Sequence, residues 1–178
     1  RLASICRHAF DCRVLAYDPY LDAAEMARRD AEKTGLTELL NQSDVGSIHC
    51  PLSEETRRMF DAGAIAALKP GARLDATARG FIHGEDALYR ALASRHLAGA
   101  GLDVWDAEPP TADHPLLSLD TVITSPHTAG VTRDSRERMA SYAANQMIEI
   151  FDGKAPARPV NTDVLAAWNK RMQVFLGG

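Results

Sequence analysis

The sequence predicts an α/β protein with a doubly wound, mainly parallel β-sheet. Two observations lead to this fold class: short apolar runs end in turn-forming residues, and segments of helical periodicity alternate with those runs along most of the 178 residues. Strands that alternate with helices of this length are joined by crossovers, which place the strands parallel to one another. The apolar fraction of 46% is enough for one well-buried core.

In the first part of the chain, proline and glycine mark where the predicted elements end. A first buried strand stops at Asp18 and Pro19, and a later strand stops at Pro51, because proline cannot donate to a strand ladder. Gly35 closes the helix between them. The elements expected here are a strand within residues 13–19, a helix over 21–33, a short helix over 37–41 and a strand at 45–49.

The second part of the chain continues this alternation and ends in helices. The expected elements are a helix at 61–68, a strand at 73–77, a helix at 85–94, strands at 99–104 and 121–124, a helix at 132–151 and a helix at 165–176. The helix at 132–151 carries Met139, Ala143, Met147 and Ile150 at helical spacing. The simplest interpretation of this apolar stripe is core packing, and a dimer contact is the alternative.

Composition narrows the classes of partner. The net charge is −4 and the sequence has no block of Lys and Arg, which argues against binding to nucleic acid or to an anionic membrane. The three cysteines are an odd number without C-x-x-C spacing, so neither a disulfide framework nor a metal site is expected. No apolar run approaches the roughly 20 residues of a membrane helix. A reducing, cytoplasmic location is therefore expected.

Three ionisable residues are notable because each follows a predicted strand in a turn. Arg79 lies in ATARG, Glu108 in LDVWDAEPP and His127 in SPHTAG. The carboxyl ends of the strands in an open α/β sheet face the ligand crevice, so these side chains can meet there. A guanidinium that holds a carboxylate, an imidazole that moves a hydroxyl proton, and a carboxylate beside that imidazole suit a 2-keto or 2-hydroxy acid.

Each of these residues also has a simpler interpretation. Taken alone, Arg79 fits a surface turn, Glu108 a solvated loop acid, and His127 a helix cap or a core histidine. Asp18 before Pro19 is a common turn opener, but its place after the first visible strand also suits ribose binding. The ordered set of three ionisable residues favours the functional interpretation.

These strings resemble the D-isomer-specific 2-hydroxyacid dehydrogenases, whose nucleotide-binding domain has an Arg-Gly turn, a Leu-Asp-Val…Glu-Pro segment and a Pro-His-x-x-Gly turn in this order. The segments HCPL at residues 49–52 and ASRHLAGA at 93–100 resemble the family as well, and the likeness runs to about Asn161. The resemblance implies a Rossmann-like nucleotide-binding domain, NAD as cofactor, and interconversion of a 2-keto acid and a D-2-hydroxy acid. It also implies a homodimer.

The resemblance further implies roles for the residues that match the family's motifs. His127 is the expected general acid/base, Glu108 its partner, and Arg79 the clamp on the substrate carboxylate. Asp103 is expected to hydrogen-bond the nicotinamide carboxamide, and Asp18 the adenosine ribose. NAD is expected rather than NADP, because no basic residue directly follows Asp18.

Further residues are expected along the cofactor. His49, Pro51 and Thr56 fall in a loop that lies against the adenosine half in relatives. Thr77 and Ala78 are expected near the nicotinamide. Together with the two aspartates named above, they form the predicted NAD site.

The amino-terminal segment departs from the family's pattern. The sequence has no G-x-G-x-x-G motif, and its first residues, RLASICRHAF, resemble the helix that follows the last of those glycines. We therefore expect an N-terminally incomplete nucleotide-binding domain over residues 1–152, which lacks its first strand and glycine-rich loop. A tail and helix over 153–178 are expected to return toward an absent substrate domain.

Several substitutions leave two alternatives open. Asp75 and Ala76 stand where an apolar residue and Asn are common in the family, and an unpaired carboxylate in a buried strand is costly. His83 stands where Val is common in the family. We expect His83 and His114 on helices or polar loops and assign them no role. The alternatives to an enzyme are a non-enzymatic NAD-sensing or corepressor-like binding module and an inactive truncated relative.

Overall fold

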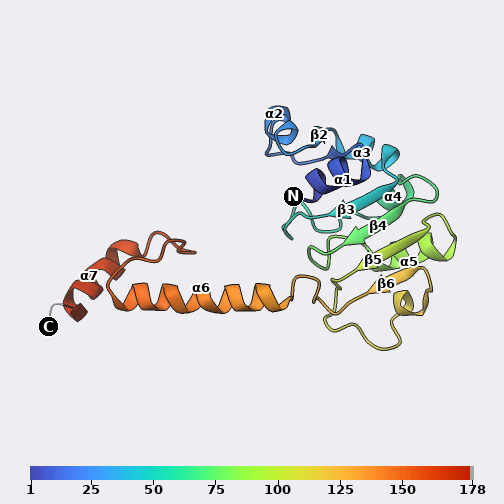
Figure 1. The fold of residues 1–178 in the computed structure, drawn as a ribbon. Helices are drawn as coiled ribbons and strands as arrows, with labels where there is room; N and C mark the ends of the chain where they lie inside the picture. The colour runs from blue at the N-terminus through green and yellow to red at the C-terminus, as the bar shows by residue number, and fades with distance from the viewer. Residues whose placement is uncertain (177–178) are drawn as a thin grey trace. The chain divides into compact units, whose positions relative to one another are not determined.

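The strands belong to the first of two units of the chain. The structure, a computed structural model, describes residues 1–176 and divides into Arg1–Ala129 and Gly130–Gly178 (Figure 1). All the strands of the described residues fall in the first unit. The expected domain boundary after residue 152 concerns the whole protein and stays a prediction, and residues 177 and 178 of the expected tail lie outside the described part.

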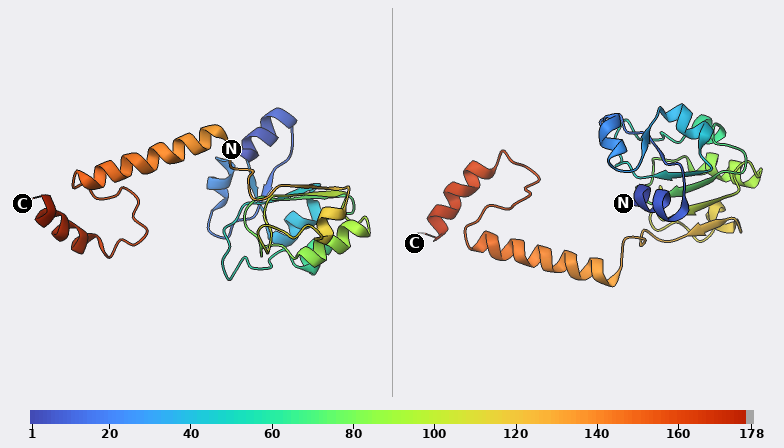
Figure 2. Two further views of the ribbon diagram at one scale, coloured as in Figure 1. Left: turned by 90° about the horizontal axis from the view of Figure 1, so that it is seen from below. Right: turned by 45° about the horizontal axis from the view of Figure 1, so that its top comes forward.

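The larger sheet of the first unit has parallel strands in the order β3-β4-β5-β6. These strands are β3 (Val45–Ile48), β4 (Arg73–Ala76), β5 (Gly99–Leu102) and β6 (Val122–Thr124). α4 (Ala62–Ala66) connects β3 to β4 and α5 (Glu85–Ala93) connects β4 to β5, and both helices lie on one face of the sheet (Figure 2). The short helix η1 (Pro115–Ser118), which was not predicted, leads to β6. The arrangement confirms the predicted parallel α/β fold.

A smaller parallel sheet pairs β1 (Leu15–Ala16) with β2 (Glu32–Lys33). α1 (Leu2–Phe10) precedes it, α2 (Ala23–Ala27) connects its strands, and α3 (Leu36–Gln42) leads on to β3. In the doubly wound strand order 3-2-1-4-5-6, β2 and β1 correspond to strands 3 and 2, and the larger sheet starts at strand 4. Among residues 1–176, no strand lies between β1 and β3, where that order places strand 1.

The helix expected over residues 21–33 is much shorter, so that prediction was wrong in its second half. α2 ends at Ala27, and Asp30 takes a left-handed conformation with φ of +64°. The Glu32 N–H then donates to the Val14 carbonyl at 2.8 Å, beside the pairing of β2 with β1. Strand pairing therefore overrides the local preference of these residues for helix. The other expected helices and strands are present, with their ends shifted by a few residues.

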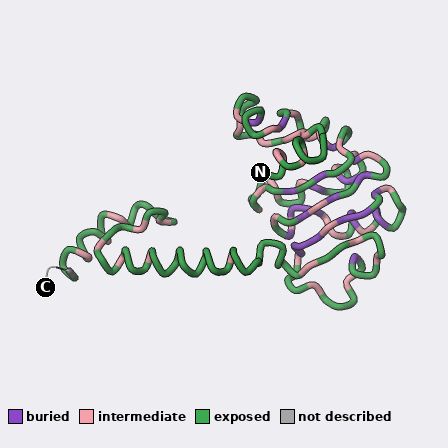
Figure 3. Tube along the Cα trace, viewed as in Figure 1, coloured by how far each residue is buried: buried purple, intermediate pink, exposed green. Residues whose placement is uncertain are grey.

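The hydrophobic core lies between the larger sheet and the helices on its face, where the buried residues gather in Figure 3. Ile65 of α4, Leu74 of β4 and Leu88 of α5 are among its fully buried side chains. Burial of a side chain of this size stabilises the fold by roughly 1.5–3 kcal/mol. β4 alternates, because Leu74 and Ala76 are buried while Asp75 between them lies on the other face.

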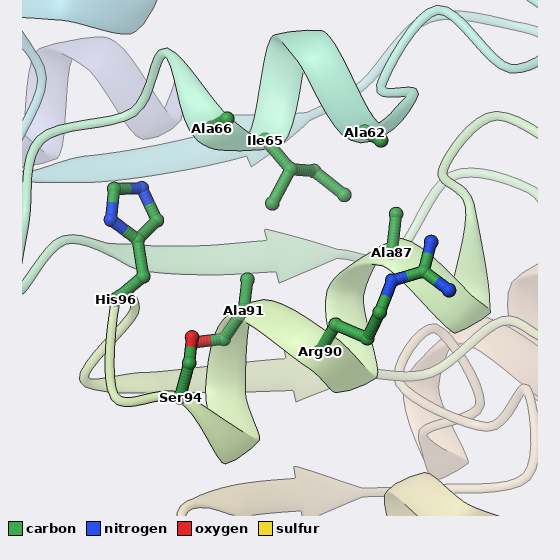
Figure 4. A pocket seen from close by; sticks show the side chains of 8 residues that line it. All are labelled: Ala62, Ile65, Ala66, Ala87, Arg90, Ala91, Ser94 and His96. Carbon is green, nitrogen blue, oxygen red and sulfur yellow. The ribbon is translucent and has the colours of Figure 1, made fainter.

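Small side chains let α4 and α5 lie close together. Ala62 and Ala66 of α4 and Ala87 and Ala91 of α5 line an open groove of about 320 Å³ between the helices (Figure 4). None of the three predicted catalytic residues lines this groove. The groove is therefore separate from the candidate active site.

The second unit contains α6 (Arg133–Phe151) and α7 (Leu165–Leu176). A capping box starts α6: the Thr132 hydroxyl accepts from the Ser135 N–H, and the Ser135 hydroxyl accepts from the Thr132 N–H. No α6 side chain is buried, and Met147 is 51% exposed. Within the described residues of the second unit no core covers the apolar stripe of this helix, so the expected core packing and the alternative dimer contact both stay predictions.

No helix among residues 1–176 is both long and apolar enough to cross a bilayer.

Candidate active site

The three predicted catalytic residues lie beyond the carboxyl ends of neighbouring strands. Arg79 follows β4, Glu108 follows β5 and His127 follows β6. Because these strands are parallel, their carboxyl ends lie at one edge of the sheet. The shared edge allows side chains that are far apart in the sequence to meet.

His127 and Glu108 form a direct pair. His127 Nδ1 lies 2.8 Å from Glu108 Oε2, and the two side chains are 39% and 37% exposed. The backbone of His127 is left-handed, with φ of +56°, which is uncommon for a residue with a Cβ. Glu108 Oε1 accepts from the Trp105 N–H at 3.1 Å. Both carboxylate oxygens therefore have a partner, and the carboxylate is oriented from two sides.

The hydrogen bond from His127 holds the pKa of Glu108 below its usual range, and the opposing effect of burial is smaller. The Trp105 N–H and the charges of His127 and Arg79 lower this pKa further. Glu108 is thus an anion through neutral and mildly acidic pH. Because an anionic carboxylate only accepts, His127 Nδ1 carries the proton between them, which leaves Nε2 to exchange a proton with a ligand.

The loop of Arg79 packs directly on the turn that carries Glu108. Arg79 is exposed, and its guanidinium donates to the Ala78 carbonyl at 2.7 Å. A Cβ at the next residue, Gly80, would lie 1.9 Å from the Trp105 carbonyl oxygen. Only a glycine permits this approach of two backbones. The structure therefore brings Arg79 beside the His127–Glu108 pair.

Asp103 holds the turn of His127 in place. It is 4% exposed, and its carboxylate accepts from the Ser125 hydroxyl and from the N–H groups of Thr128 and Ala129. Burial acts to raise the pKa of Asp103, but these hydrogen bonds, together with the charge of His127, hold it below its usual range. The expected bond from Asp103 to the nicotinamide stays a prediction.

Trp105 belongs to the site, and sequence reasoning missed it. It is 2% exposed, its indole Nε1 donates to the Ser125 carbonyl at 3.1 Å, and its backbone N–H donates to Glu108. The His114 ring meets the indole edge-on, with ring centroids 5.2 Å apart. The signal was present in the LDVW run, because a tryptophan directly after a buried strand needs a partner for its N–H.

Two histidines that were placed on helices or polar loops are buried or paired. His83 is fully buried, and neither ring nitrogen has a partner in the described part of the chain. Burial lowers the pKa of His83, and the nearby charge of Glu85 offsets this only in part. A backbone bridge to Phe60 draws His83 inward. His114 Nε2 lies 3.3 Å from Glu85 Oε2.

Asp18 lies just beyond β1, at the carboxyl end of the smaller sheet. It is half-buried, and its Oδ1 accepts from the Tyr20 N–H at 2.8 Å. This contact supports the simpler interpretation of Asp18 as a turn residue. A carboxylate can accept further hydrogen bonds, and an acid after a strand in this place binds ribose in dinucleotide folds. Both interpretations are therefore compatible with the geometry.

The loop after β3 carries three of the predicted cofactor residues. His49 is exposed, and its Nε2 lies 2.8 Å from the Ser47 hydroxyl. The Thr56 hydroxyl donates to the Pro51 carbonyl at 2.7 Å and accepts from the Ser53 N–H at 2.8 Å. Thr56 therefore shapes the loop from within. The expected contacts of His49, Pro51 and Thr56 with adenosine stay predictions.

Several groups in the first unit fit NAD in chemical type. Thr77 is exposed and Ala78 half-buried directly after β4. The Asp18 carboxylate can accept hydrogen bonds from ribose hydroxyl groups. For a metal ion, by contrast, residues 1–176 offer no group of three or more acidic, His or Cys side chains.

Asp75 is not the unpaired buried carboxylate that was expected. It is half-buried, and its Oδ2 accepts from the Ser47 hydroxyl at 2.8 Å. The next strand places Gly101 beside it, where a Cβ would come within 3.1 Å of Asp75 Oδ1. The expected cost was wrong because a hydroxyl from β3 and the room left by a glycine on β5 accommodate the charge.

Comparisons with known proteins identify the family of this chain. A family model described as D-isomer specific 2-hydroxyacid dehydrogenase, NAD binding domain, matches residues 1–129. (S)-sulfolactate dehydrogenase from Chromohalobacter salexigens is 46% identical over 129 residues, which are 72% of this chain and 42% of that protein. Glyoxylate reductase from Thermofilum pendens is 39% identical over 158 residues, which are 88% of this chain and 47% of that protein.

A solved structure shows the same fold. The crystal structure of D-lactate dehydrogenase from Aquifex aeolicus, complexed with NAD and lactic acid, matches with a TM-score of 0.73 at 33% identity. The match covers 82% of this chain and 48% of that one, so this chain spans about half the length of the relatives it matches. The matched residues 1–129 contain both sheets and the three predicted catalytic residues. The chain therefore belongs to the D-isomer specific 2-hydroxyacid dehydrogenase family, and residues 1–129 match the NAD binding domain of that family.

Proposed function

We propose that the protein containing this chain is an NAD-dependent oxidoreductase that interconverts a 2-keto acid and a D-2-hydroxy acid. The observation that carries the proposal is the 2.8 Å contact between His127 Nδ1 and Glu108 Oε2. This contact leaves His127 Nε2 available to a substrate, and the Arg79 loop packs against the turn that carries Glu108. A proton donor next to a guanidinium is the pair of groups that a 2-keto acid requires.

The residues of this chain divide the work as follows. His127 Nε2 donates a proton to the carbonyl oxygen during reduction and takes it from the hydroxyl during oxidation. Ionised Glu108 stabilises the protonated imidazole. The Arg79 guanidinium binds the substrate carboxylate and offsets the charge that develops on the carbonyl oxygen. A bound nicotinamide cofactor would supply the hydride to the carbon that carries this oxygen as NADH, or accept it as oxidised NAD.

The same proposal covers the residues that hold NAD. The Asp18 carboxylate accepts hydrogen bonds from the adenosine ribose, and Asp103 is assigned to the nicotinamide carboxamide. The remaining contacts are assigned to His49, Pro51 and Thr56 on the adenosine side and to Thr77 and Ala78 on the nicotinamide side. The preference for NAD over NADP rests on Asp18, because a carboxylate repels the 2′-phosphate.

The substrate class follows from the names of the relatives. Sulfolactate, glyoxylate and lactic acid are small 2-hydroxy or 2-keto acids. We assign this class to the protein without choosing among its members. We also predict that the protein forms a homodimer and is located in the cytoplasm.

The test is steady-state reduction of glyoxylate, hydroxypyruvate and phosphohydroxypyruvate with NADH by the whole protein that contains this chain. Turnover of at least one of them is expected, and the product of hydroxypyruvate or phosphohydroxypyruvate should be the D-hydroxy acid, whereas glyoxylate gives achiral glycolate. Calorimetric binding of NAD without any turnover would favour the NAD-sensing module instead. Neither binding nor turnover would identify an inactive relative and overturn the proposal.

A further inference from the structure

Asp106 lies in the turn after β5, close to Glu108 in the chain, and its carboxylate joins other loops. Asp106 Oδ1 accepts from the Phe81 N–H at 2.7 Å, and Oδ2 accepts from the Arg58 guanidinium. The Asp106 side chain is 19% exposed, so these contacts are partly shielded from water. A charge-assisted contact of this kind is stronger than one between neutral groups.

These contacts connect the loops beyond three adjacent parallel strands. Arg58 follows β3, Phe81 follows β4 and Asp106 follows β5. Arg58 strengthens the connection, because its guanidinium also donates to the His83 carbonyl and its backbone N–H donates to the Phe81 carbonyl at 2.7 Å. One carboxylate and one guanidinium thus bind three loops together.

The backbone at this junction is strained. Arg58 has φ of +57° and Phe81 has φ of +63°, and both are left-handed values that residues with a Cβ seldom adopt. Such conformations persist only where the surroundings hold them. The surroundings here are the hydrogen bond from the Arg58 N–H to the Phe81 carbonyl and the Asp106 carboxylate, which accepts from both residues.

The junction lies beside the proposed catalytic groups. Phe81 is separated from Arg79 only by Gly80, the residue that touches the Trp105 carbonyl. In the loop after β5, the Trp105 N–H donates to Glu108 at 3.1 Å, and the N–H of the following residue, Asp106, donates to Glu85 at 2.8 Å. A movement of either loop would therefore change the distance between the Arg79 guanidinium and the Glu108 carboxylate.

We propose that Asp106, with Arg58 as its counter-ion, is a positioning residue that fixes the Arg79 loop against the turn of Glu108. The proposal rests on the function proposed above for what the positioned groups do. The geometric part, in which Asp106 orients Glu108, can be tested without any catalysis. In the described residues, the Asp106 carboxylate forms no hydrogen bond or ion pair with any of the three proposed catalytic side chains.

The test compares Asp106→Ala with the unaltered 178-residue chain by NMR. Loss of positioning weakens the contacts of Glu108 with His127 and Trp105, so the pKa of Glu108 rises toward its ordinary value. Removal of a nearby negative charge, taken alone, would shift this pKa in the opposite direction. The sign therefore separates positioning from simple electrostatics. Exposed Asp120, in the turn before β6, supplies the matched control Asp120→Asn, for which no change is expected.

Amide hydrogen exchange gives a second measurement on the same samples. In Asp106→Ala, exchange is expected to accelerate at Phe81, which loses its acceptor, and also at Trp105, whose acceptor is Glu108. Acceleration at Phe81 alone, with the Glu108 pKa unchanged or lowered, would overturn the proposal. Arg58→Gly protects the test against misfolding, because glycine accepts a φ of +57° without strain. It too is expected to accelerate exchange at Trp105.

In the whole protein, Asp106→Ala is expected to lower kcat about 10- to 100-fold, as loss of reactive geometry does. Asp106→Glu, which keeps the charge, is expected to recover part of that loss, and Asp120→Asn is expected to have none. An unchanged kcat in an active protein would contradict the positioning role. If the unaltered protein shows no turnover, the function proposed above fails, while the NMR result still decides whether Asp106 orients Glu108.

Discussion

The two ring nitrogens of His127 have different surroundings. Nδ1 faces the Glu108 carboxylate at 2.8 Å, so in the proposed mechanism the ring keeps one proton on that side while Nε2 exchanges the other. The low pKa of Glu108, caused first by the His127 hydrogen bond, keeps this arrangement intact well below neutral pH. His127 is therefore the residue on which the proposed chemistry depends most directly.

Replacement of His127 by Asn is expected to lower kcat of the whole protein by roughly 10²- to 10⁴-fold, because a positioned acid/base is lost. The affinity for NAD should change little, since His127 is assigned to the substrate. Steady-state kinetics together with a calorimetric NAD titration measure both quantities. Turnover close to that of the unaltered protein would remove His127 from the mechanism.

Glu108→Gln is expected to move the pH at which keto-acid reduction falls to half its maximum toward lower values. The anionic carboxylate favours the protonated imidazole, and a neutral amide does not, so protonation of the acid group then requires more acidic solution. A pH-rate profile of the whole protein measures the shift. Glu137→Gln, on α6, is the control and should leave the profile unchanged; superimposable profiles for Glu108→Gln would show that Glu108 is not coupled to the acid/base.

Sequence reasoning predicted three residues that the structure places beyond the carboxyl ends of neighbouring strands, but it did not predict the residues that hold their loops. Arg79, Glu108 and His127 could be predicted because each lies in a short motif directly after a strand, and the geometry of a parallel sheet brings such positions together. Asp106 and Arg58 carry no such motif. Their contact joins loops that follow different strands, and pairing between distant loops cannot be read from local patterns.

At the scale of elements, the close approach of the β4 and β5 loops depends on Gly80. Gly80→Ala is expected to lower the free energy of unfolding by about 3 kcal/mol or more, because the added Cβ would lie 1.9 Å from the Trp105 carbonyl oxygen and the backbones must separate. Gly35→Ala is the matched control, since a Cβ there meets nothing within 4 Å. Denaturant unfolding of the two variants checks the difference, and equal stabilities would show that the loops separate at little cost.

The elements themselves were predictable wherever local signals and sheet pairing agree. From β3 onward, apolar runs ended by proline or glycine correspond to the observed strands with small shifts. The helix expected over 21–33 ends early because Glu32 and Lys33 pair with β1. This pairing joins residues that lie far apart in the sequence, so local helical propensity does not reveal it.

At the scale of the whole molecule, the core and the candidate site both belong to the first unit. Every residue of the main hydrophobic cluster lies between Leu40 and Leu116. We therefore expect residues 1–129 to fold alone, with a lowered pKa of Glu108 like that in the 178-residue chain. Urea unfolding and NMR titration of the two proteins check this prediction, and an unfolded 1–129 fragment would contradict it.

The order of the strands has a consequence for how the protein can change. Asp18 follows β1 of the smaller sheet, whereas Arg79 and Glu108 follow β4 and β5 of the larger one. A substitution at Asp18 removes none of the hydrogen bonds that hold Glu108 against His127 and Trp105. Coenzyme preference can therefore be redesigned at Asp18 while the contact between His127 and Glu108 is kept.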